Sequence, residues 1–354
     1  MNHQQILGGH VPTSQVSGAA AVRMSDRQTL AEHVLAGLTK PQKALSSAWF
    51  YDDEGSRLFQ RIMALPEYYL TRAEHELLRE KVGEILHWLN PGHRPLDLIE
   101  LGSGDGAKTI TLCQALHERG VECVYRPIDV SEHALAELSR RFEEHLPHVA
   151  IEPVLGDYLA HWPEVEPQRQ QVAMLLGSNL GNFEEACATE LLKRLRSQLR
   201  PGDILLLGLD LVKDPHTIQA AYDDTSGVTA AFNLNLLRRL NRELGMDFDL
   251  GRFNHFASYC PLQGVMRSFL VSSIEQVVRS AVLNREFHFA AGETIYTEQS
   301  QKYTLQSIDH LAALSGFCCV HTIVNERYQY ALAIWRRPND ERLNGGGRRR
   351  PAEG

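Results

Sequence analysis

The stretch LDLIELGSGDGAKTITL, residues 96–112, decides the fold of this chain. Its first six residues form an apolar run, which is typical of a buried β-strand. A glycine-rich turn follows, and the apolar spacing after the turn predicts a helix that ends at Gly120. A strand, a glycine turn and a helix in this order are typical of α/β proteins that bind nucleotides. The remaining question is which nucleotide the turn holds.

Three kinds of nucleotide site fit the turn. Gly102, Gly104 and Ala107 match the dinucleotide fingerprint G-x-G-x-x-G/A. The segment GSGDGAKT is one residue short of a P-loop, with Ala107 in place of the second glycine. The pattern E-x-G-x-G-x-G, which begins at Glu100, is the turn that holds S-adenosylmethionine (SAM).

Carboxylates around the turn argue against a triphosphate. Glu100 precedes the turn and Asp105 lies within it, so both would repel phosphates but attract the sulfonium and ammonium groups of SAM. Asp129 ends the next strand and could bind the ribose diol of either SAM or NAD. Asp157, in the GDY that ends the following strand, lies where an adenine amino group is expected. These features favour SAM over NAD and leave a turn used only for packing as a third interpretation.

Helix and strand patterns alternate from about residue 73, which predicts a parallel sheet covered on both faces. The rhythm breaks after residue 213, where a helical segment and then antiparallel strand patterns follow. A helix pattern comes next, and the final strand pair, residues 318–335, resembles the antiparallel hairpin that closes a SAM-type methyltransferase sheet. We expect an α/β, Rossmann-like class I SAM-dependent methyltransferase with an inserted α+β substrate-binding domain. The predicted parts are a disordered arm (1–20), the substrate-binding domain (21–72 with 213–302), the SAM-binding domain (73–212 with 303–337) and a disordered tail (338–354).

Composition excludes several classes of protein. The chain has 354 residues and a net charge of −8, and its Lys and Arg residues are scattered, so we expect no nucleic-acid partner. No apolar run reaches the roughly 18 residues of a membrane span, and no signal peptide is apparent. The six cysteines lack metal or disulfide spacing, and CCVH at 318–321 lies in a strand-like run. We therefore expect a cytoplasmic monomer without a metal.

Several motifs together carry a resemblance that covers about residues 30–337. They are WFYDDEGSRLFQRIMALPEYYLTRAE, ELGSGDGAKT, LLGSNLGNF, LLLGLDLVKD, AYDDTSGVTAAFNLN and YTEQSQKY. With them the chain resembles the histidine-specific Nα-methyltransferase family of ergothioneine biosynthesis. The resemblance implies that the chain uses three SAM molecules to convert L-histidine to Nα,Nα,Nα-trimethylhistidine (hercynine).

The glycine turn and the carboxylates at the strand ends give the predicted SAM-binding set, which is Glu100, Gly102, Ser103, Gly104, Lys108, Asp129 and Asp157. The resemblance implies the substrate-binding set, which is Tyr68, Asn182, Tyr222, Met266, Glu298 and Ser300, and it implies that Tyr51 and Phe59 are the catalytic aromatics near the amine. Within the substrate set, Glu298 and Ser300 read the imidazole, whereas Asn182 and Tyr222 hold the amino-acid end. The chain departs from the compared family member at Asn179, where that member has a small hydroxyl residue, and at Leu70, where it has proline.

Each assignment has a plainer alternative. Aromatic faces attract a quaternary ammonium product, but Tyr51 and Phe59 also fit a core stripe at helical spacing. Glu298 and Ser300 are two residues apart, so on a strand they share a face and could bond both imidazole nitrogens; the alternative is a solvated strand edge. Asn182 follows a strand end, where α/β sheets place ligands, or it caps the next helix.

Three other functions stay open from the sequence. The same fold could methylate another aromatic amino acid such as tryptophan, although an indole has a single N–H and could not use both Glu298 and Ser300. A NAD-dependent oxidoreductase and a non-catalytic SAM-binding protein are the other two. The group that removes the amine proton is Tyr51 or solvent.

Overall fold

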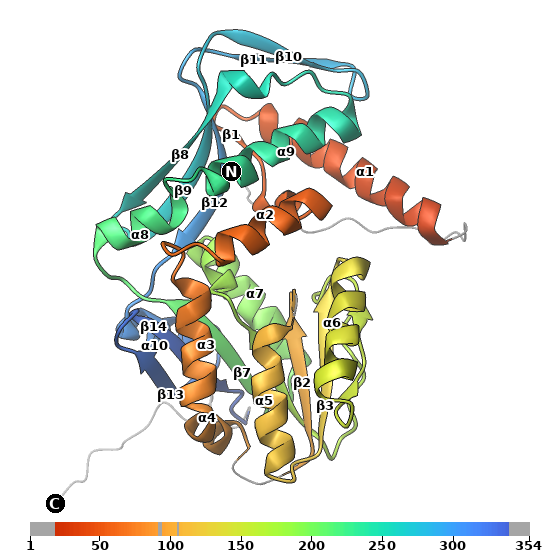
Figure 1. The fold of residues 1–354 in the computed structure, drawn as a ribbon, viewed down its shortest axis with the longest axis vertical. Coiled ribbons are helices and arrows are strands. Elements are labelled where there is room, and N and C mark those ends of the chain that lie inside the picture. Colours follow the sequence, from red (N-terminus) through yellow and green to blue (C-terminus); the bar gives the residue numbers. More distant parts are fainter. Residues whose placement is uncertain (1–17, 91–93, 105, 340–354) are drawn as a thin grey trace, which may run out of the picture. The chain divides into compact units, whose positions relative to one another are not determined.

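The computed structural model describes residues 18–90, 94–104 and 106–339. Asp105 and most of the predicted arm and tail lie outside the described residues. Helix α1 begins at Gly18, so the last three residues of the predicted disordered arm are helical instead. Figure 1 shows the course of the chain.

The described helices and strands follow the predicted order closely. The helices are α1 Gly18–Leu38, α2 Asp53–Met63, α3 Leu70–Glu80, α4 Val82–Leu89, α5 Ala107–Glu118, α6 Glu132–His145, α7 Glu185–Gln198, α8 Pro215–Tyr222, α9 Val228–Leu244 and α10 Leu305–Leu314, with 3-10 turns η1 Ser47–Phe50, η2 Asn179–Asn182 and η3 Leu250–Arg252. The strands are β1 Lys43–Ala44, β2 Leu96–Leu101, β3 Cys123–Asp129, β4 Ala150–Ile151, β5 Val154–Leu155, β6 Gln170–Leu175, β7 Ile204–Asp210, β8 Phe253–Cys260, β9 Val265–Ser272, β10 Gln276–Ser280, β11 Arg285–Phe289, β12 Thr294–Gln301, β13 Cys318–Asn325 and β14 Tyr330–Arg336.

Two compact units divide these elements. The first holds the described residues up to Ser56 together with Phe232–His255 and Leu270–Thr297. The second holds Arg57–Ala231, Phe256–Phe269 and the described residues from Glu298 on. The domain boundaries expected from the sequence stay a prediction.

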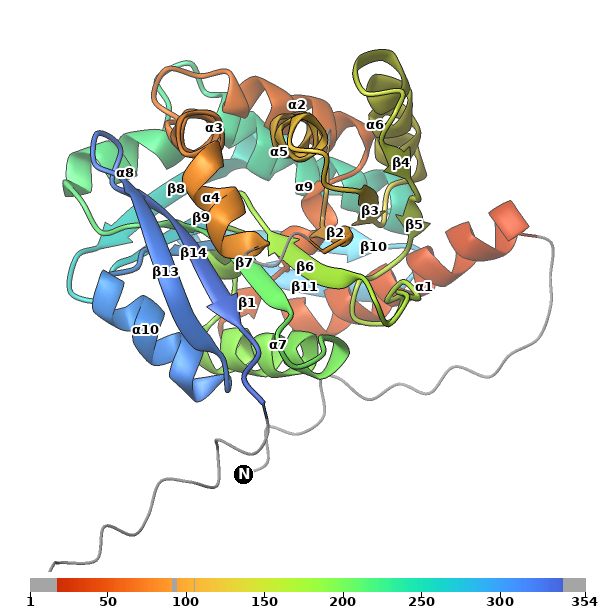
Figure 2. The ribbon, with the colours of Figure 1, turned by 90° about the horizontal axis from the view of Figure 1, so that it is seen from below.

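An eight-stranded sheet of order β13-β14-β7-β6-β2-β3-β4, with β5 also paired to β3, forms the centre of the second unit. Strands β7, β6, β2 and β3 are parallel, and β14 and β13 close the edge as the predicted antiparallel pair. Helices α3 to α6 cover one face and α7 and α10 the other (Figure 2). This is the mixed α/β arrangement that the sequence predicts, accompanied by an additional β-sheet region. The carboxyl ends of β2, β3, β6 and β7 therefore meet at one edge, where such sheets place their ligands.

The central strands are buried on both sides because helices cover both faces. All residues of β2, β6 and β7 are buried, which explains why apolar residues predominate in them. Their side chains pack with α7, α10 and Trp335 of β14 in one apolar core. Burial of this kind contributes about 25 cal/mol for each Å² of apolar surface removed from water.

Two consecutive helices, α3 and α4, are separated only by Lys81. Lys81, with φ −107° and ψ 12°, ends α3 and precedes α4. Val82 and Gly83 follow as the first two residues of α4. Leu70 is the first residue of α3, a position that proline also favours, so the family's proline is compatible with this backbone.

Glu74 of α3 is a fully buried carboxylate in the second unit. Its oxygens accept hydrogen bonds from the Gly177 backbone N–H (2.8 Å) and the Tyr330 hydroxyl (2.7 Å), and it forms an ion pair with Lys108. Gly208 of β7 leaves room for this carboxylate: a Cβ there would lie 2.0 Å from Glu74 Oε1 and 2.6 Å from the Tyr330 hydroxyl. Gly208 is therefore required by close packing.

A second sheet has the order β1-β12-β9-β8, and β10 and β11 form a hairpin. Strands β9 to β12 correspond to the predicted antiparallel strands, whereas β8 was not predicted and β1 pairs parallel to β12. In the first unit, Phe248, Phe253 and Phe289 pack edge to face with ring centroids 5.4–6.0 Å apart. Asp52 accepts a hydrogen bond from Asn235 (2.7 Å) and pairs with Arg242 (2.7 Å), which ties η1 and α2 to α9. These contacts give the insertion a core of its own.

Candidate active site

The three glycines of the turn after β2 have two different roles, which are helix packing and ligand access. Gly102, Gly104 and Gly106 have φ values of 69°, 55° and 64°, a region that L side chains rarely adopt. A Cβ at Gly106 would lie 2.7 Å from Leu138 of α6, so this glycine permits helix packing. A Cβ at Gly102 or Gly104 would meet nothing within 4 Å. The first two glycines therefore leave open space beside the turn, as a ligand-binding turn requires.

Asp129 lies beside this turn, as the sequence predicts. Its Oδ2 accepts a hydrogen bond from the Gly104 N–H at 3.1 Å and its Oδ1 accepts one from the Ser131 N–H at 2.9 Å. Strand β5 pairs with β3 so that Leu155 lies opposite Asp129, and the exposed Asp157 follows two residues later. The carboxylates predicted for ribose and adenine thus follow neighbouring strands.

Glu100 points into the protein. It is 3% exposed and accepts hydrogen bonds from Thr109 (2.6 Å) and the Tyr125 hydroxyl. Burial raises the pKa of Glu100 to about 7, although these hydrogen bonds oppose the rise. Glu100 therefore anchors the start of the turn to α5 and β3.

Ser103 supplies the observation that fits a ligand at this turn. It is 7% exposed, and its hydroxyl has no hydrogen-bond partner among the described residues. A buried hydroxyl without a partner costs free energy, so a polar ligand in the turn would satisfy it. This hydroxyl, the open space at Gly102 and Gly104 and the Asp129 carboxylate together fit SAM. Lys108, also predicted for SAM, pairs with Glu74 in this structure, and its contact with SAM stays a prediction.

Glu298 and Ser300 lie on β12, whose burial alternates along most of the strand. Ser300 is 3% exposed, so the alternative of a solvated strand edge is wrong for it. Glu298 is half-buried, and burial raises its pKa to about 7 while the Lys302 charge lowers it. Near neutral pH this carboxyl group therefore titrates, and it can accept an N–H when ionised.

Lys302 and Asp210 form a buried ion pair that the sequence did not reveal. Lys302 Nζ lies 2.9 Å from Asp210 Oδ2, 2.9 Å from Ser300 Oγ and 2.9 Å from the Tyr222 hydroxyl. The Tyr222 hydroxyl donates to Ser300 Oγ at 2.8 Å. The available signal was the lysine two residues after Ser300 in SQKY, directly after β12 ends at Gln301.

Asp210 is itself held by several groups at the end of β7. Tyr69 donates to its Oδ2 at 2.7 Å, Lys213 pairs with its Oδ1, and its backbone N–H donates to Ser178 Oγ at 3.1 Å. Ser178 has φ 58°, an unusual backbone for a residue other than glycine. The motifs LGLDLVKD and LLGSNLGNF therefore meet at the carboxyl edge of the sheet.

A chain of aromatic contacts leads from Tyr222, the ring bonded to Ser300, to Tyr68 and Phe59. Tyr222 and Tyr68 are each 8% exposed, and their ring centroids are 6.3 Å apart in an edge-to-face contact. Phe59 packs edge to face on Tyr68 at 6.2 Å. Met266, 1% exposed, lies on β9, the strand next to β12. The structure thus brings four of the predicted aromatic and apolar residues into the second unit with Glu298 and Ser300.

Tyr51 belongs to the first unit. It is 41% exposed, and its ring contacts Phe232 with centroids 5.6 Å apart. The alternative interpretation was that WFYDDEGSRLF contributes a stripe of buried core residues. Phe50 and Leu58 are buried in this way, but Tyr51 is not. Its predicted place beside the reacting amine stays a prediction.

Asn182 ends η2, just after β6. The N-cap of α7 is Glu184, so the alternative role of Asn182 as the cap of that helix is wrong. Asn179 begins η2, and a Cβ at Gly177 would lie 3.7 Å from its side chain. Both asparagines are thus at the carboxyl edge of the sheet, where a substrate is expected.

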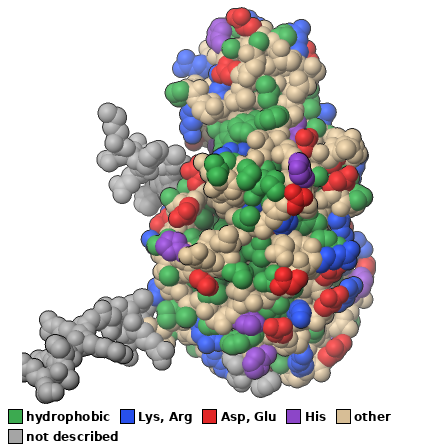
Figure 3. Space-filling model, turned by 90° about the vertical axis from the view of Figure 1, so that its left-hand side faces the viewer, with side chains coloured by type: hydrophobic (Ala, Val, Ile, Leu, Met, Phe, Trp, Pro, Cys, Tyr) green, Lys and Arg blue, Asp and Glu red, His purple; other side chains and the backbone are tan. Residues whose placement is uncertain are grey.

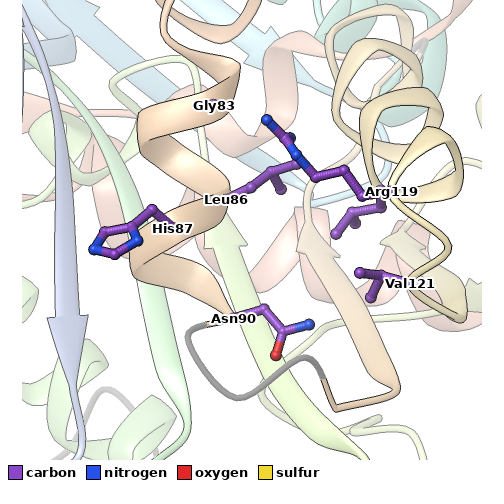
Figure 4. Close-up of a pocket in the computed structure, with 7 residues that line it drawn as sticks. Gly83, Leu86, His87, Asn90, Arg119 and Val121 are labelled. Carbon is purple, nitrogen blue, oxygen red and sulfur yellow. The ribbon is translucent and has the colours of Figure 1, made fainter.

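Other surface features bear less on the chemistry. A hollow of about 210 Å³ between α4 and α5, lined by residues such as Leu86, Asn90 and Arg119, contains none of the predicted site residues (Figure 4). On the face drawn in Figure 3, Lys and Arg side chains are interspersed with Asp and Glu. Within the described ranges, no helix has the length and apolar character of a membrane span, and no cluster of His, Cys, Asp and Glu could hold a metal ion.

Comparison with known proteins decides between the nucleotides. A family model described as histidine-specific methyltransferase, SAM-dependent, matches residues 30–337. The chain belongs to this family. SAM is therefore its co-substrate, and the NAD-dependent alternative is wrong.

The chain is similar to a histidine methyltransferase, to an ergothioneine biosynthesis protein and to a methyltransferase that is named for another substrate. Histidine N-alpha-methyltransferase of Mycolicibacterium smegmatis is 37% identical over 88% of this chain and 95% of the relative. Ergothioneine biosynthesis protein 1 of Neurospora crassa is 29% identical over 77% of this chain and 31% of that protein. The 4-dimethylallyltryptophan N-methyltransferase easF of Claviceps fusiformis is 28% identical over 59% of this chain and 61% of its own length.

Proposed function

We propose that this chain trimethylates the α-amino group of L-histidine to Nα,Nα,Nα-trimethylhistidine, the first step of ergothioneine biosynthesis. Membership of the histidine-specific family and the similarity to a histidine N-alpha-methyltransferase over most of both chains support this activity. The single observation that supports histidine as the substrate is that Glu298 and the buried Ser300 lie two residues apart, on one face of β12. A carboxylate and a hydroxyl side by side suit the two nitrogens of an imidazole.

The proposed mechanism divides the work among the residues of the chain. SAM, when bound, supplies a methyl group that is already activated for displacement at carbon. In this proposal SAM occupies the open space beside Gly102 and Gly104. It forms hydrogen bonds with the Ser103 hydroxyl and with Asp129, and Asp157 lies at its adenine end.

The substrate set orients the acceptor. Glu298 and Ser300 fix the imidazole, Met266 and Tyr68 shape the walls, and Asn182 and Tyr222 hold the amino-acid end. Fixing the amine in this way converts a bimolecular encounter into an oriented transfer. Aromatic rings attract the growing ammonium group, and Tyr51 and Phe59 are the residues proposed for this role. The amine must lose its proton before it attacks, and Tyr51 or solvent accepts that proton.

The proposal includes a cytoplasmic monomer with a SAM-binding and a substrate-binding part. All six cysteines are free, which fits a reducing compartment. The two compact units are consistent with a two-part enzyme.

Mass spectrometry of the purified protein with SAM and each of the twenty amino acids tests the activity. We expect mass increases of one, two and three methyl groups on histidine alone. The variant Ser300→Ala is the matched comparison, because it removes one proposed imidazole contact without adding volume. Methylation of a different amino acid, or SAM binding without any turnover, would overturn the proposal.

A second candidate is another aromatic amino acid of the tryptophan type. The similarity to a 4-dimethylallyltryptophan N-methyltransferase favours it, although the identity is lower and covers less of the chain. The Glu298 and Ser300 pair argues against it, since an indole offers one N–H and no unprotonated nitrogen. The same mass-spectrometric assay separates the two candidates.

A further inference from the structure

Lys302 has an unusual hydrogen-bond arrangement for a lysine so close to a substrate site. It is 2% exposed, and an ammonium group has three donors and no acceptor. All three donors are used within the protein, on Asp210, Tyr222 and Ser300, each at 2.9 Å. Lys302 therefore has no donor left for a ligand, and its influence on a substrate passes through its neighbours.

The Ser300 hydroxyl is left with one hydrogen-bonding capacity. A hydroxyl has two lone pairs and one proton. One lone pair accepts from Lys302 and the other accepts from Tyr222, at 2.9 and 2.8 Å. Burial raises the pKa of Tyr222 well above its usual value, so this phenol keeps its proton as a donor. What Ser300 can still offer a ligand is its own O–H.

We propose that Lys302 is a specificity-determining residue that makes Ser300 a pure hydrogen-bond donor, so that the site selects an imidazole with one unprotonated nitrogen. Glu298 then accepts the single N–H, and Ser300 donates to the bare nitrogen. A doubly protonated imidazolium is excluded, because Ser300 has no lone pair for its second N–H. An indole leaves the Ser300 O–H unpaired, which is costly in a buried site. The inference rests on the proposed function, since it assumes that Glu298 and Ser300 meet the imidazole.

Asp210 fixes Lys302 in this position and provides a matched control. Its Oδ2 accepts from both Lys302 and Tyr69, while its Oδ1 pairs with Lys213. Lys213→Met removes a partner of the same carboxylate, and Lys302→Met removes the partner that also contacts Ser300 and Tyr222. In either variant one lysine still pairs with Asp210, so the buried carboxylate keeps a cation.

The test is 15N NMR of L-histidine labelled in its imidazole ring and bound to the full chain with S-adenosylhomocysteine at pH 7. In the wild type we expect one protonated and one bare nitrogen in a single tautomer. In Lys302→Met we expect a second tautomer or a doubly protonated ring, together with a rise of about tenfold in KM for histidine and a smaller change in kcat. Lys213→Met is expected to keep the wild-type spectrum.

Two results would overturn the inference alone. One is a doubly protonated imidazole bound to the wild type, a measurement that does not depend on the folding of any variant. The other is a Lys302→Met protein that folds and binds histidine with an unchanged spectrum and KM. A wild-type protein that binds no histidine would overturn the proposed function as well, so the two failures are distinguishable.

Discussion

Asp129 is the residue on which the predicted SAM contact depends most directly. Its oxygens already accept from Gly104 and Ser131, which places the carboxylate beside the glycine turn. Asp129→Ala removes a charge-assisted hydrogen bond and should weaken SAM binding by roughly 1.5–3 kcal/mol. Calorimetric titration with SAM measures this loss. Glu132→Ala, at the exposed start of α6, is the control, and unchanged SAM affinity in a folded Asp129→Ala protein would refute the assignment.

Glu298 and Met266 are predicted to set the substrate ring. Glu298→Ala should lower kcat/KM for histidine by roughly 2–4 kcal/mol, because a charge-assisted bond and its orienting effect are lost. Adding Met266→Val shortens a side chain that is 1% exposed and should open space for a larger ring. We expect the double variant to lose histidine activity and gain measurable activity on tryptophan.

Methylated product from both amino acids, measured by mass spectrometry, checks this prediction. Met266→Val alone is the control for the change in volume. Wild-type histidine turnover in the double variant would mean that Glu298 does not contact the imidazole. Loss of histidine activity without tryptophan product would mean that other residues shape the pocket.

At the scale of elements, the glycine turn and the packing of α5 against α6 respond to different substitutions. Gly104→Ala and Gly106→Ala both place an L side chain at positive φ, which costs roughly 1–2 kcal/mol. Only Gly106→Ala also pushes a Cβ to 2.7 Å from Leu138, which should add about 1–3 kcal/mol. Urea unfolding should therefore show the larger loss of stability for Gly106→Ala. SAM titration should show the clearer loss of affinity for Gly104→Ala, and the opposite ranking would contradict this division of tasks.

Local patterns predicted most elements, and the exceptions depend on distant partners. The apolar run of β2, the glycine turn and the closing hairpin are local patterns, so the sequence shows them. From the sequence alone, Lys302 would be interpreted as a solvated lysine at a strand end. Its burial depends on Asp210, which is far away in the chain. Strand β8 was not predicted, because its sequence FNHFASYC does not alternate regularly between apolar and polar residues. Among the site residues, the motif predicts residue identity, whereas the geometry of a network such as Ser300, Tyr222 and Lys302 requires the fold.

For the molecule as a whole, buried Glu100 should make stability depend on pH. Its pKa is raised from 4.5 to about 7, so the folded protein keeps this proton in a range where the unfolded chain has released it. Raising the pH through this window therefore favours the unfolded state, by on the order of 3 kcal/mol in total. Glu100→Gln should remove the contribution of Glu100 and leave that of Glu298, whose pKa is also raised to about 7. Free energies of unfolding of both proteins between pH 4 and about 8 measure the difference, and parallel curves would contradict the prediction.

Gly208 restricts the order in which this protein can accumulate substitutions. Gly208→Ala alone meets the Glu74 carboxylate and the Tyr330 hydroxyl and should be severely destabilising. In a background that carries Glu74→Ala and Tyr330→Phe, the same methyl group meets neither oxygen and should be nearly neutral. We expect the effects to be non-additive by about 2 kcal/mol or more, which unfolding of the single, double and triple variants would measure. A lineage of such enzymes can therefore place a side chain at position 208 only after positions 74 and 330 have changed, so these three positions should change together in history rather than independently.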